Sequence, residues 1–312
     1  PYLARMLQRA ALATTLSLLI SLGLAGCVAA GAKIARPQVP TGGPSLVVLG
    51  IAQDGGVPQA GSFGDRRSGK RWMIDATPDF RRQSLELYRA SGGAAKPVVD
   101  GIFLTHAHMG HYTGLMFLGH ESIGAKSVPV YAMARMSEFL RANGPWSQLV
   151  KYDNITIMPL VAGEPVRLAD DLTVTAILVP HRQEFSEVVA FKIAGPTRTA
   201  LWLPDIDSWR EWDAQGTRLE DMLATVDIAY LDGTFFANGE IPGRDMSGFP
   251  HPFMSHTIER LAALPASERA KVRFIHLNHT NPALAAGTDA RNTIDAAGMR
   301  VADEGEIEPL FK

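Results

Sequence analysis

The sequence predicts an α/β fold in which β-sheets lie between layers of helices. From Ser45 onward, short apolar runs rich in β-branched residues alternate with segments of helical period. Many of these runs are almost continuously apolar, which is typical of strands covered on both faces. At 312 residues and 46% hydrophobic content, the chain is long enough to bury a substantial core.

The apolar runs and helical patterns give the following order of elements. We expect strands over 45–52, 71–76, 101–106, 128–133, 155–160, 172–180, 188–193, 199–205, 227–233 and 272–277. We expect helices over 79–90, 110–123, 134–143, 145–152, 207–214 and 255–264. Five strands end directly in His or Asp, and rigid strand ends at one sheet edge are where sites are built.

The N-terminal segment has the parts of an export signal. Arg5 and Arg9 precede an apolar run over 10–24, which is shorter than the roughly 20 residues that a membrane span needs. The following "LAGC" resembles a bacterial lipobox, in which Cys27 would become the lipid-bearing first residue of the mature protein. A plain signal peptide or an uncleaved anchor is the alternative.

The predicted domain organisation follows from this segment. Residues 1–27 would be the lipoprotein signal, 28–44 a flexible tether rich in small residues, Pro and Gly, and 45–312 the folded domain. We therefore expect an exported protein on the periplasmic side of a bacterial membrane, anchored through a lipid at Cys27.

Charge and cysteine content exclude several classes of function. The formal net charge is −2 and the basic residues are scattered, so no nucleic-acid partner is expected. Cys27 is the single cysteine, which rules out an intramolecular disulfide and a Cys-based zinc site.

Histidines dominate the candidate site. All nine follow residue 100: His106, His108, His111, His120, His181, His251, His256, His276 and His279. On an extended strand end, His106 and His108 point to the same side and could grip one ion, and His111 could reach the same pocket from a helix start. We expect His120 and His256 to be ordinary surface or hydrogen-bonded residues.

The order HxHxxH, His181, Asp205 and a late histidine resembles the metallo-β-lactamase superfamily. The resemblance covers residues 45–312 and implies a four-layer αβ/βα sandwich with metals at one sheet edge. Within the superfamily, the chain resembles the branch of PQQ-biosynthesis B proteins. The strings that carry this resemblance are "AQDGGVPQ" at 52–59, "DATPDFR" at 75–81, "LDGTFF" at 231–236 and "HLNHTNPAL" at 276–284. The placing of His251 is similar to the phosphodiesterase and tRNA-end-processing branches.

The resemblance implies a role for each site residue. His106, His108 and His181 would hold a first metal, Asp205 would bridge toward a second, and His111 and His276 would complete that second site. His279 would supplement or replace His276. His251 would be the general acid or transition-state stabiliser, with Asp205 beside it as a catalytic residue. Asp75 would orient a ligand histidine, and Asp232 would lie at the pocket.

Three further polar residues have open roles. Asp207 is a rival to Asp205, but its position at a helix start favours an N-cap. Arg244 and Arg182 could each bind an anionic group of a substrate, or could be solvated surface residues.

The chain departs from the superfamily pattern at Gly110, where HxHxDH proteins carry Asp. Glycine supplies no donor atom, so we expect one ion rather than two, most simply zinc, with manganese or iron as alternatives. Asp54 could supply the missing carboxylate from another loop. Alternatively, the chain has lost hydrolysis and only binds a ligand.

The expected function is therefore metal-dependent hydrolysis of a small molecule. A metal-activated water would attack an ester, a phosphodiester or an amide. The alternative is a non-hydrolytic, PQQ-related oxidative or ligand-binding protein that uses the same pocket. The substrate cannot be read from the fold class.

Overall fold

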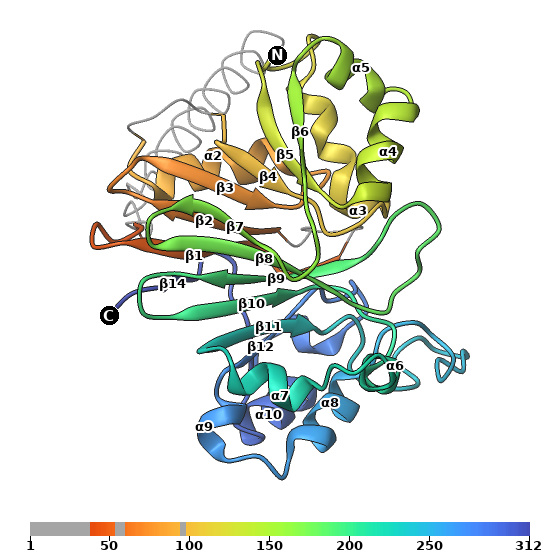
Figure 1. Ribbon diagram of the computed structural model, residues 1–312. Coiled ribbons are helices and arrows are strands. Elements are labelled where there is room, and N and C mark those ends of the chain that lie inside the picture. Colours follow the sequence, from red (N-terminus) through yellow and green to blue (C-terminus); the bar gives the residue numbers. More distant parts are fainter. Residues whose placement is uncertain (1–37, 54–59, 94–97) are drawn as a thin grey trace, which may run out of the picture. The chain divides into compact units, whose positions relative to one another are not determined.

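The computed structural model of the protein describes residues 38–53, 60–93 and 98–312. Its first sheet has the strand order β14-β1-β2-β3-β4-β5-β6 (Figure 1). The strands are β1 (Pro44–Gly50), β2 (Ala60–Asp65), β3 (Lys70–Ile74), β4 (Gly101–Phe103), β5 (Val128–Ala132), β6 (Ile155–Pro159) and β14 (Ile307–Pro309). Strands β1 to β3 pair antiparallel, and β3 to β6 pair parallel.

The second sheet has the order β13-β12-β11-β10-β9-β8-β7. Its strands are β7 (Pro165–Ala169), β8 (Leu172–Leu178), β9 (Val189–Ala194), β10 (Thr199–Leu203), β11 (Ile228–Asp232), β12 (Val272–Ile275) and β13 (Arg300–Val301). Strands β7 to β10 pair antiparallel, whereas β10, β11, β12 and β13 run parallel. Parallel neighbours bring their carboxyl ends to the same edge of the sheet, so residues that follow them meet there.

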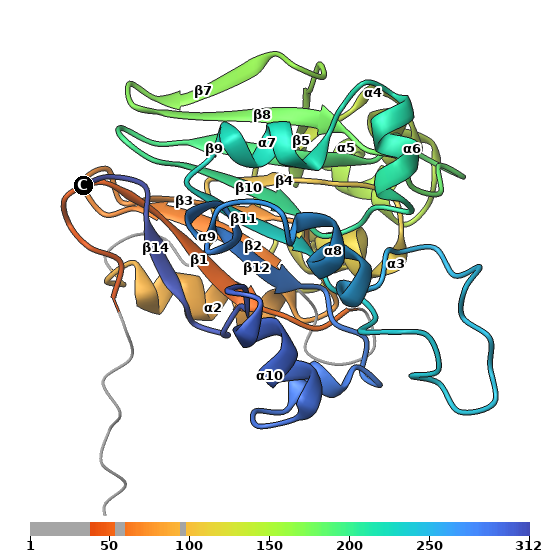
Figure 2. The ribbon, with the colours of Figure 1, turned by 90° about the horizontal axis from the view of Figure 1, so that it is seen from below.

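Helices cover the outer face of each sheet (Figure 1). The first sheet carries α2 (Phe80–Ala90), α3 (Met109–Tyr112), the 3₁₀ helix η1 (Thr113–Leu118), α4 (Ala134–Ala142) and α5 (Trp146–Lys151). The second carries α6 (Trp209–Ala214), α7 (Leu219–Ala224), α8 (Met254–Leu261), α9 (Ala266–Arg269), η2 (Pro282–Leu284) and α10 (Asp289–Ala296). The segment between β11 and α8 extends away from the second sheet (Figure 2).

Three layers of buried side chains hold these elements together. One lies between the first sheet and its helices, and includes Phe80 and Leu140. A second lies between the two sheets, where Phe103 meets Phe191 edge-on with ring centroids 5.6 Å apart. The third joins the second sheet to its helices, and includes Trp212. Helix, sheet, sheet and helix therefore form the expected four-layer αβ/βα sandwich, and this prediction is confirmed.

Packing begins before Ser45, the predicted start of the domain. The Val39 side chain is fully buried, and its backbone N–H donates to the carbonyl oxygen of Ala90 at 2.9 Å. The last part of the segment predicted as a tether therefore packs against α2. Cys27 and the rest of the predicted signal lie outside the described residues. Among the residues that the structure describes, no helix combines the length and apolar character needed to cross a membrane.

The helix predicted over 110–123 is shorter, because it changes to 3₁₀ geometry after Tyr112. Gly114 lies where this turn passes under the loop that follows β3. A Cβ atom at Gly114 would lie 2.1 Å from the carbonyl oxygen of Thr77, so only glycine fits there. This close approach positions α3, and with it His111, against the sheet edge.

Candidate metal centre

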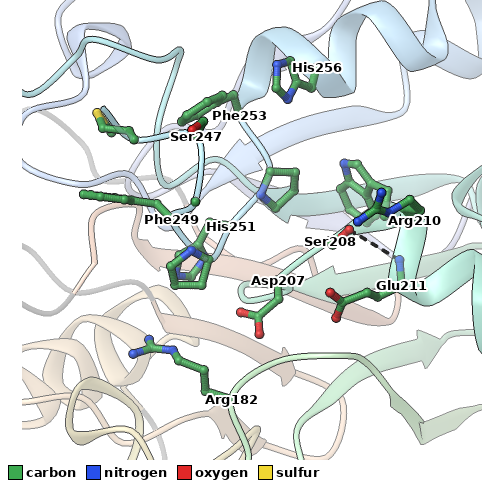
Figure 3. Close-up of a pocket in the computed structure, with 15 residues that line it drawn as sticks. Arg182, Asp207, Ser208, Arg210, Glu211, Ser247, Phe249, His251, Phe253 and His256 are labelled. Carbon is green, nitrogen blue, oxygen red and sulfur yellow. Dashed lines mark hydrogen bonds between the residues drawn. The ribbon is translucent and has the colours of Figure 1, made fainter. Parts of the chain in front are cut away.

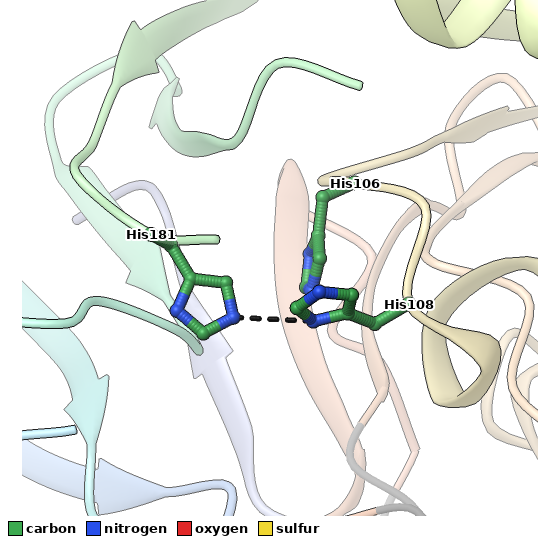
Figure 4. A group of neighbouring side chains, drawn as sticks. All are labelled: His106, His108 and His181. Atoms are coloured by element: carbon green, nitrogen blue, oxygen red, sulfur yellow. Dashed lines mark hydrogen bonds between the residues drawn. The ribbon is translucent and has the colours of Figure 1, made fainter. Parts of the chain in front are cut away.

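Strand ends of both sheets deliver the candidate ligands to one place. His106 and His108 follow β4, and His111 lies on α3. From the second sheet, His181 follows β8, Asp205 follows β10 and His276 follows β12. Figure 4 shows His181 facing His106 and His108, and donor atoms of these three residues lie within 4.8 Å of one another.

Asp205 lies in the middle of the cluster. Its Oδ2 atom is 3.3 Å from Nε2 of His111, and its Oδ1 atom is 3.3 Å from Nε2 of His276. The same Oδ1 lies 3.7 Å from Nε2 of His181. One carboxylate thus faces histidines from both sheets, as a residue shared between two groups of ligands would.

The Nδ1 atoms of the ligand histidines are held by hydrogen-bonding groups behind them. Nδ1 of His111 lies 2.7 Å from the buried carboxylate of Asp75. The Thr105 hydroxyl is 2.9 Å from Asp75 Oδ1 and 3.0 Å from Nδ1 of His106. Nδ1 of His276 lies 2.8 Å from the Thr234 hydroxyl. These contacts fix the orientation of the rings and leave Nε2 directed at the cluster.

Asp207 does not cap α6, so that prediction was wrong. The N-cap is Ser208, whose side chain accepts from the backbone N–H of Glu211. The Asp207 carboxylate instead lies 2.7 Å from Nδ1 of His181. Although burial acts to raise the pKa of Asp207, His181 and nearby positive charges lower it overall. Asp207 is therefore placed to orient His181, a candidate ligand, as Asp75 is placed to orient His111.

His108 is arranged differently from the other histidines. Its Nδ1 atom faces Nε2 of His181 at 3.2 Å, and its Nε2 faces the exposed carboxylate of Glu184 at 3.2 Å. A ligand role for His108 would thus use Nδ1. Burial lowers the pKa of His108 to about 4, despite the opposing effect of Glu184.

The buried donor set fits a divalent metal ion. Nε2 of His106, Nε2 of His276 and Oδ2 of Asp205 are buried, and none has a hydrogen-bond partner within the described part of the chain. Burial lowers the pKa values of His106 and His276 well below the ordinary range, which keeps both imidazoles neutral as ligands must be. Buried polar atoms without partners are costly, and an ion coordinated by them would remove this cost.

His251 and Asp232 form a separate pair at the border of the cluster. Nδ1 of His251 lies 2.6 Å from Oδ2 of Asp232. The other oxygen of Asp232 accepts from the backbone N–H and the hydroxyl of Thr234. Burial alone would lower the pKa of His251, but the carboxylates of Asp232, Asp205 and Asp207 raise it overall. The pair therefore favours a protonated imidazole beside the ligands.

Backbone strain is concentrated at this centre. Asp75, His251 and His276 have φ angles of 65°, 96° and 64°, a region that residues with side chains rarely adopt. Each such residue costs about 1–3 kcal/mol and persists only where the surrounding structure enforces it. The fold thus holds these side chains in place before any ligand binds.

A pocket of about 630 Å³ opens beside His251 and Asp207 (Figure 3). Arg182 lines this pocket, together with residues of α6 and of the segment that precedes α8. Arg244 is exposed, and its guanidinium stacks 5.3 Å from the centre of the Phe249 ring rather than lining the pocket. Of the two arginines proposed to bind an anionic group, Arg182 is the one at the site.

Other predicted residues lie outside the cluster. His279 is exposed and belongs to none of the groups of converging metal-binding donors found among the described residues. Asp54 falls outside the described residues. Gly110 is buried on α3, one residue before His111. His120 stacks on Tyr152, and the exposed His256 lies at the outer wall of the pocket.

The sequence reasoning missed Thr105, Thr234 and Glu184, and misjudged Asp207. Thr105 precedes His106, and Thr234 lies two residues beyond the end of β11, so their positions at strand ends were a usable signal. Glu184 lies in an irregular segment after β8, and only the folded chain brings it to His108.

The sequence of this chain is similar to those of known proteins. A family profile described as "Beta-lactamase superfamily domain" matches residues 70–277. The coenzyme PQQ synthesis protein B of Methylobacterium nodulans is 28% identical, over 83% of this chain and 97% of that protein. The protein of the same name from Gluconobacter oxydans is 24% identical, over 86% of this chain and 92% of the relative.

Solved structures share the fold at low sequence identity. Zn²⁺-bound PqqB from Methylobacterium extorquens aligns with a TM-score of 0.68 at 19% identity, over 85% of this chain and 99% of that chain. A diphosphatase of the PhnP family aligns with a TM-score of 0.57 at 22% identity, over 85% and 96% of the two chains. Human tRNase Z, short form, aligns with a TM-score of 0.55 at 12% identity, over 86% and 100%.

Proposed function

Because the chain belongs to the β-lactamase superfamily, we propose that it is a metal-dependent hydrolase of the PqqB-like type. The observation that carries this proposal is the convergence of donor atoms of His106, His108 and His181 within 4.8 Å of one another, beside the buried carboxylate of Asp205. The Zn²⁺ bound by the similar PqqB structure, and the hydrolases among the structures of the same fold, support it.

The first ion would be held by His106, His108 and His181, with Asp205 beside them. His111 and His276 face Asp205 from the other side, but Gly110 adds no donor to that group. We therefore propose one tightly bound ion per chain. The neutral imidazoles and single carboxylate suit zinc best, and manganese or iron less well.

A divalent ion bound there would polarise the electrophile and lower the pKa of a water molecule toward neutrality. Asp205, whose pKa burial raises above its ordinary value, would accept the proton of the attacking water with the carboxylate oxygen that does not bind the ion. His251, held at Nδ1 by Asp232, would donate a proton from Nε2 to the leaving group. The substrate would be a small-molecule ester, phosphodiester or amide that extends into the 630 Å³ pocket.

The test is to measure metal content and hydrolysis together. Protein purified after growth with zinc, manganese and iron should contain about one ion per chain and hydrolyse members of an ester, phosphodiester and amide panel. A chelator should abolish turnover, and the same metal should restore it. A purified wild type without stoichiometric metal would contradict the proposal, because the nucleophile would then have no source.

A second candidate function follows from the relatives. They are named coenzyme PQQ synthesis protein B, and Gly110 removes a donor from the cluster. A non-hydrolytic, PQQ-related oxidative or ligand-binding role on the same pocket is therefore the alternative. Full metal occupancy without hydrolysis of any panel member would favour this alternative over the hydrolase.

We also propose export and lipid anchoring at Cys27, on the sequence pattern of residues 1–27 alone. Labelling of cells with a palmitate analogue should mark the wild type and not a Cys27→Ala variant. Globomycin should cause the unprocessed form to accumulate. Equal labelling of both proteins would contradict the anchor.

A further inference from the structure

The pocket beside His251 has an apolar wall. The apolar side chains that line it are Trp209, Met246, Phe249, Pro250, Pro252 and Phe253. Most belong to the segment before α8, where Phe235, Met246 and Phe253 also form a small core of their own. A volume of about 630 Å³ lies in the range of small-molecule sites. Such a wall would take an apolar, ring-like part of a ligand.

Arg182 supplies a positive charge to the lining of the same pocket. It directly follows His181, and Figure 3 shows it below His251 and Asp207 among the residues that line the pocket. Its exposed guanidinium makes no hydrogen bond or ion pair among the residues that the structure describes. Its donors are thus available to a ligand.

The carboxylates near Arg182 already have other partners. The positive charge of Arg182 lowers the pKa values of Asp207 and Glu184, and stronger effects of closer groups act on both as well. Yet Asp207 lies 2.7 Å from Nδ1 of His181, and Glu184 lies 3.2 Å from Nε2 of His108. Neither comes within 4.0 Å of the guanidinium as an ion pair. Both carboxylates already contact histidines. The guanidinium of Arg182 therefore remains available to bind an anion.

The remaining charges of the pocket do not compete with this role. Arg210 and Glu211 are adjacent on α6, carry opposite charges and are both exposed. The electrostatic effects of their two charges on a ligand in the pocket would largely cancel. Arg244 stacks on Phe249 outside the pocket. Besides the imidazole of His251, which already pairs with Asp232, the positive charge that lines this pocket close to the candidate metal ligands comes from Arg182.

We propose that Arg182 binds an anionic group on the non-reacting part of the substrate. The site then favours small molecules that combine an apolar, ring-like portion with a carboxylate or phosphoryl group. This inference rests on the proposed function for its reaction, but its binding component stands independently. A guanidinium can donate two parallel hydrogen bonds to either anion, which a lysine cannot reproduce.

The experiment uses a matched pair of aryl esters with zinc-supplemented full-length protein. Phenyl acetate and 4-carboxyphenyl acetate differ only by the ring carboxylate. The wild type should prefer the charged ester, and Arg182→Ala should reduce that preference in kcat/KM by about 10-fold, as expected for one exposed charge-assisted contact. Arg182→Lys should retain part of the preference for the charged ester. Arg244→Ala removes the same charge from a neighbouring segment and should keep the wild-type ratio.

A binding measurement separates this inference from the proposed function. Benzoate should bind the wild type more tightly than benzamide by calorimetry, and Arg182→Ala should remove the difference. If no ester is hydrolysed but this loss is seen, the hydrolase proposal fails and the inference stands. If Arg182→Ala changes neither the ester ratio nor benzoate binding, or if Arg244→Ala has the same effect, the inference is overturned. Unchanged thermal unfolding would show that the variants are folded.

Discussion

Nδ1 of His251 and Oδ2 of Asp232 lie 2.6 Å apart, and the backbone at His251 has a φ angle of 96°. The imidazole is almost buried, so without a nearby carboxylate its charged form would be disfavoured. The contact therefore sets the protonation state of the residue proposed to donate a proton.

Replacing Asp232 with Asn should lower the pKa of His251. In the metal-free wild type, this pKa lies above its ordinary value, because the carboxylates outweigh burial. Asp232→Asn removes the strongest of them, so the effect of burial should then lower the pKa relative to the wild type. NMR titration of the His251 ring, assigned with a His251→Asn variant, measures this directly. Asp207→Asn should shift it less, since Asp207 is the weakest of the three carboxylates acting on it. An equal shift in both variants would contradict the pairing.

His106→Ala and His279→Ala should differ sharply in metal content. His106 is fully buried and its Nε2 atom has no partner among the described residues, whereas His279 is exposed and lies outside the cluster. After dialysis against buffered zinc, elemental analysis should find bound metal in His279→Ala and little in His106→Ala. The reverse result would mean that His279 replaces a ligand.

Asp207 and the adjacent Ser208 offer a test of orientation against capping. Asp207→Ala should weaken metal binding by roughly 10–100-fold, as is typical when the partner of a ligand histidine is lost. Ser208→Ala should leave metal affinity unchanged but reduce the free energy of unfolding by about 1 kcal/mol, because it removes the N-cap of α6. Competition with a zinc chelator and urea unfolding measure the two effects. Equal metal affinities in the two variants would contradict the role given to Asp207.

Gly110→Asp should raise the number of bound ions from about one to about two per chain. His111, Asp205 and His276 already face one another, and a carboxylate beside them would complete a second group of ligands. Calorimetric titration with zinc measures the stoichiometry, and Gly110→Ala controls for the added Cβ atom. Two tight sites in the wild type would show that the chain does not need this carboxylate.

The Glu220–Arg260 pair predicts a pH-dependent change in stability away from the site. Hydrogen bonding to Arg260 lowers the pKa of Glu220 from 4.5 to about 2. A depressed carboxyl pKa contributes stability that is fully present above pH 4.5 and is lost as the pH falls toward 2. Glu220→Gln should thus cost about 1–2 kcal/mol at pH 7, allowing for partial exposure, and progressively less as the pH falls through 2. Denaturant unfolding at several pH values measures this. Glu259→Gln, which alters an exposed carboxylate without an ion pair among the described residues, is the matched control.

Much of the fold was predictable because its strands are long apolar runs. The segments expected as strands around Ile102, Val130 and Leu201 form β4, β5 and β10, since burial on both faces requires continuous hydrophobicity. Strand β2 was missed because its sequence, AGSFGD, has no such run. Its glycines serve close packing instead: a Cβ atom at Gly61 would lie 2.8 Å from the Trp202 ring. Periodicity does not reveal this kind of constraint.

The candidate site was predictable only in part for a similar reason. Strand ends identify which side chains reach the sheet edge, and this reasoning selected His106, Asp205 and His276. The positions of strand ends do not show which nitrogen of a histidine ring faces the cluster. Nor do they show which side chain contacts the other nitrogen. Asp207 resembles a helix cap in the sequence, and only the folded path of the chain sets it against His181. Likewise, sequence alone could not choose between Arg182 and Arg244.

Residues at both ends of strand β10 contact residues of the first sheet or of the loops that follow its strands. Before its first residue, Arg198 pairs with Glu308 of β14, and after its last residue Asp205 faces the histidines that follow β4. The first contact is an ion pair within the chain, whereas the second would be closed by a bound metal. A chain with one cysteine has no internal disulfide, so the metal would act as its removable cross-link between the sheets. Removal of the metal would then leave the pair of Arg198 and Glu308 as the remaining one of these two links between the sheets at the ends of β10.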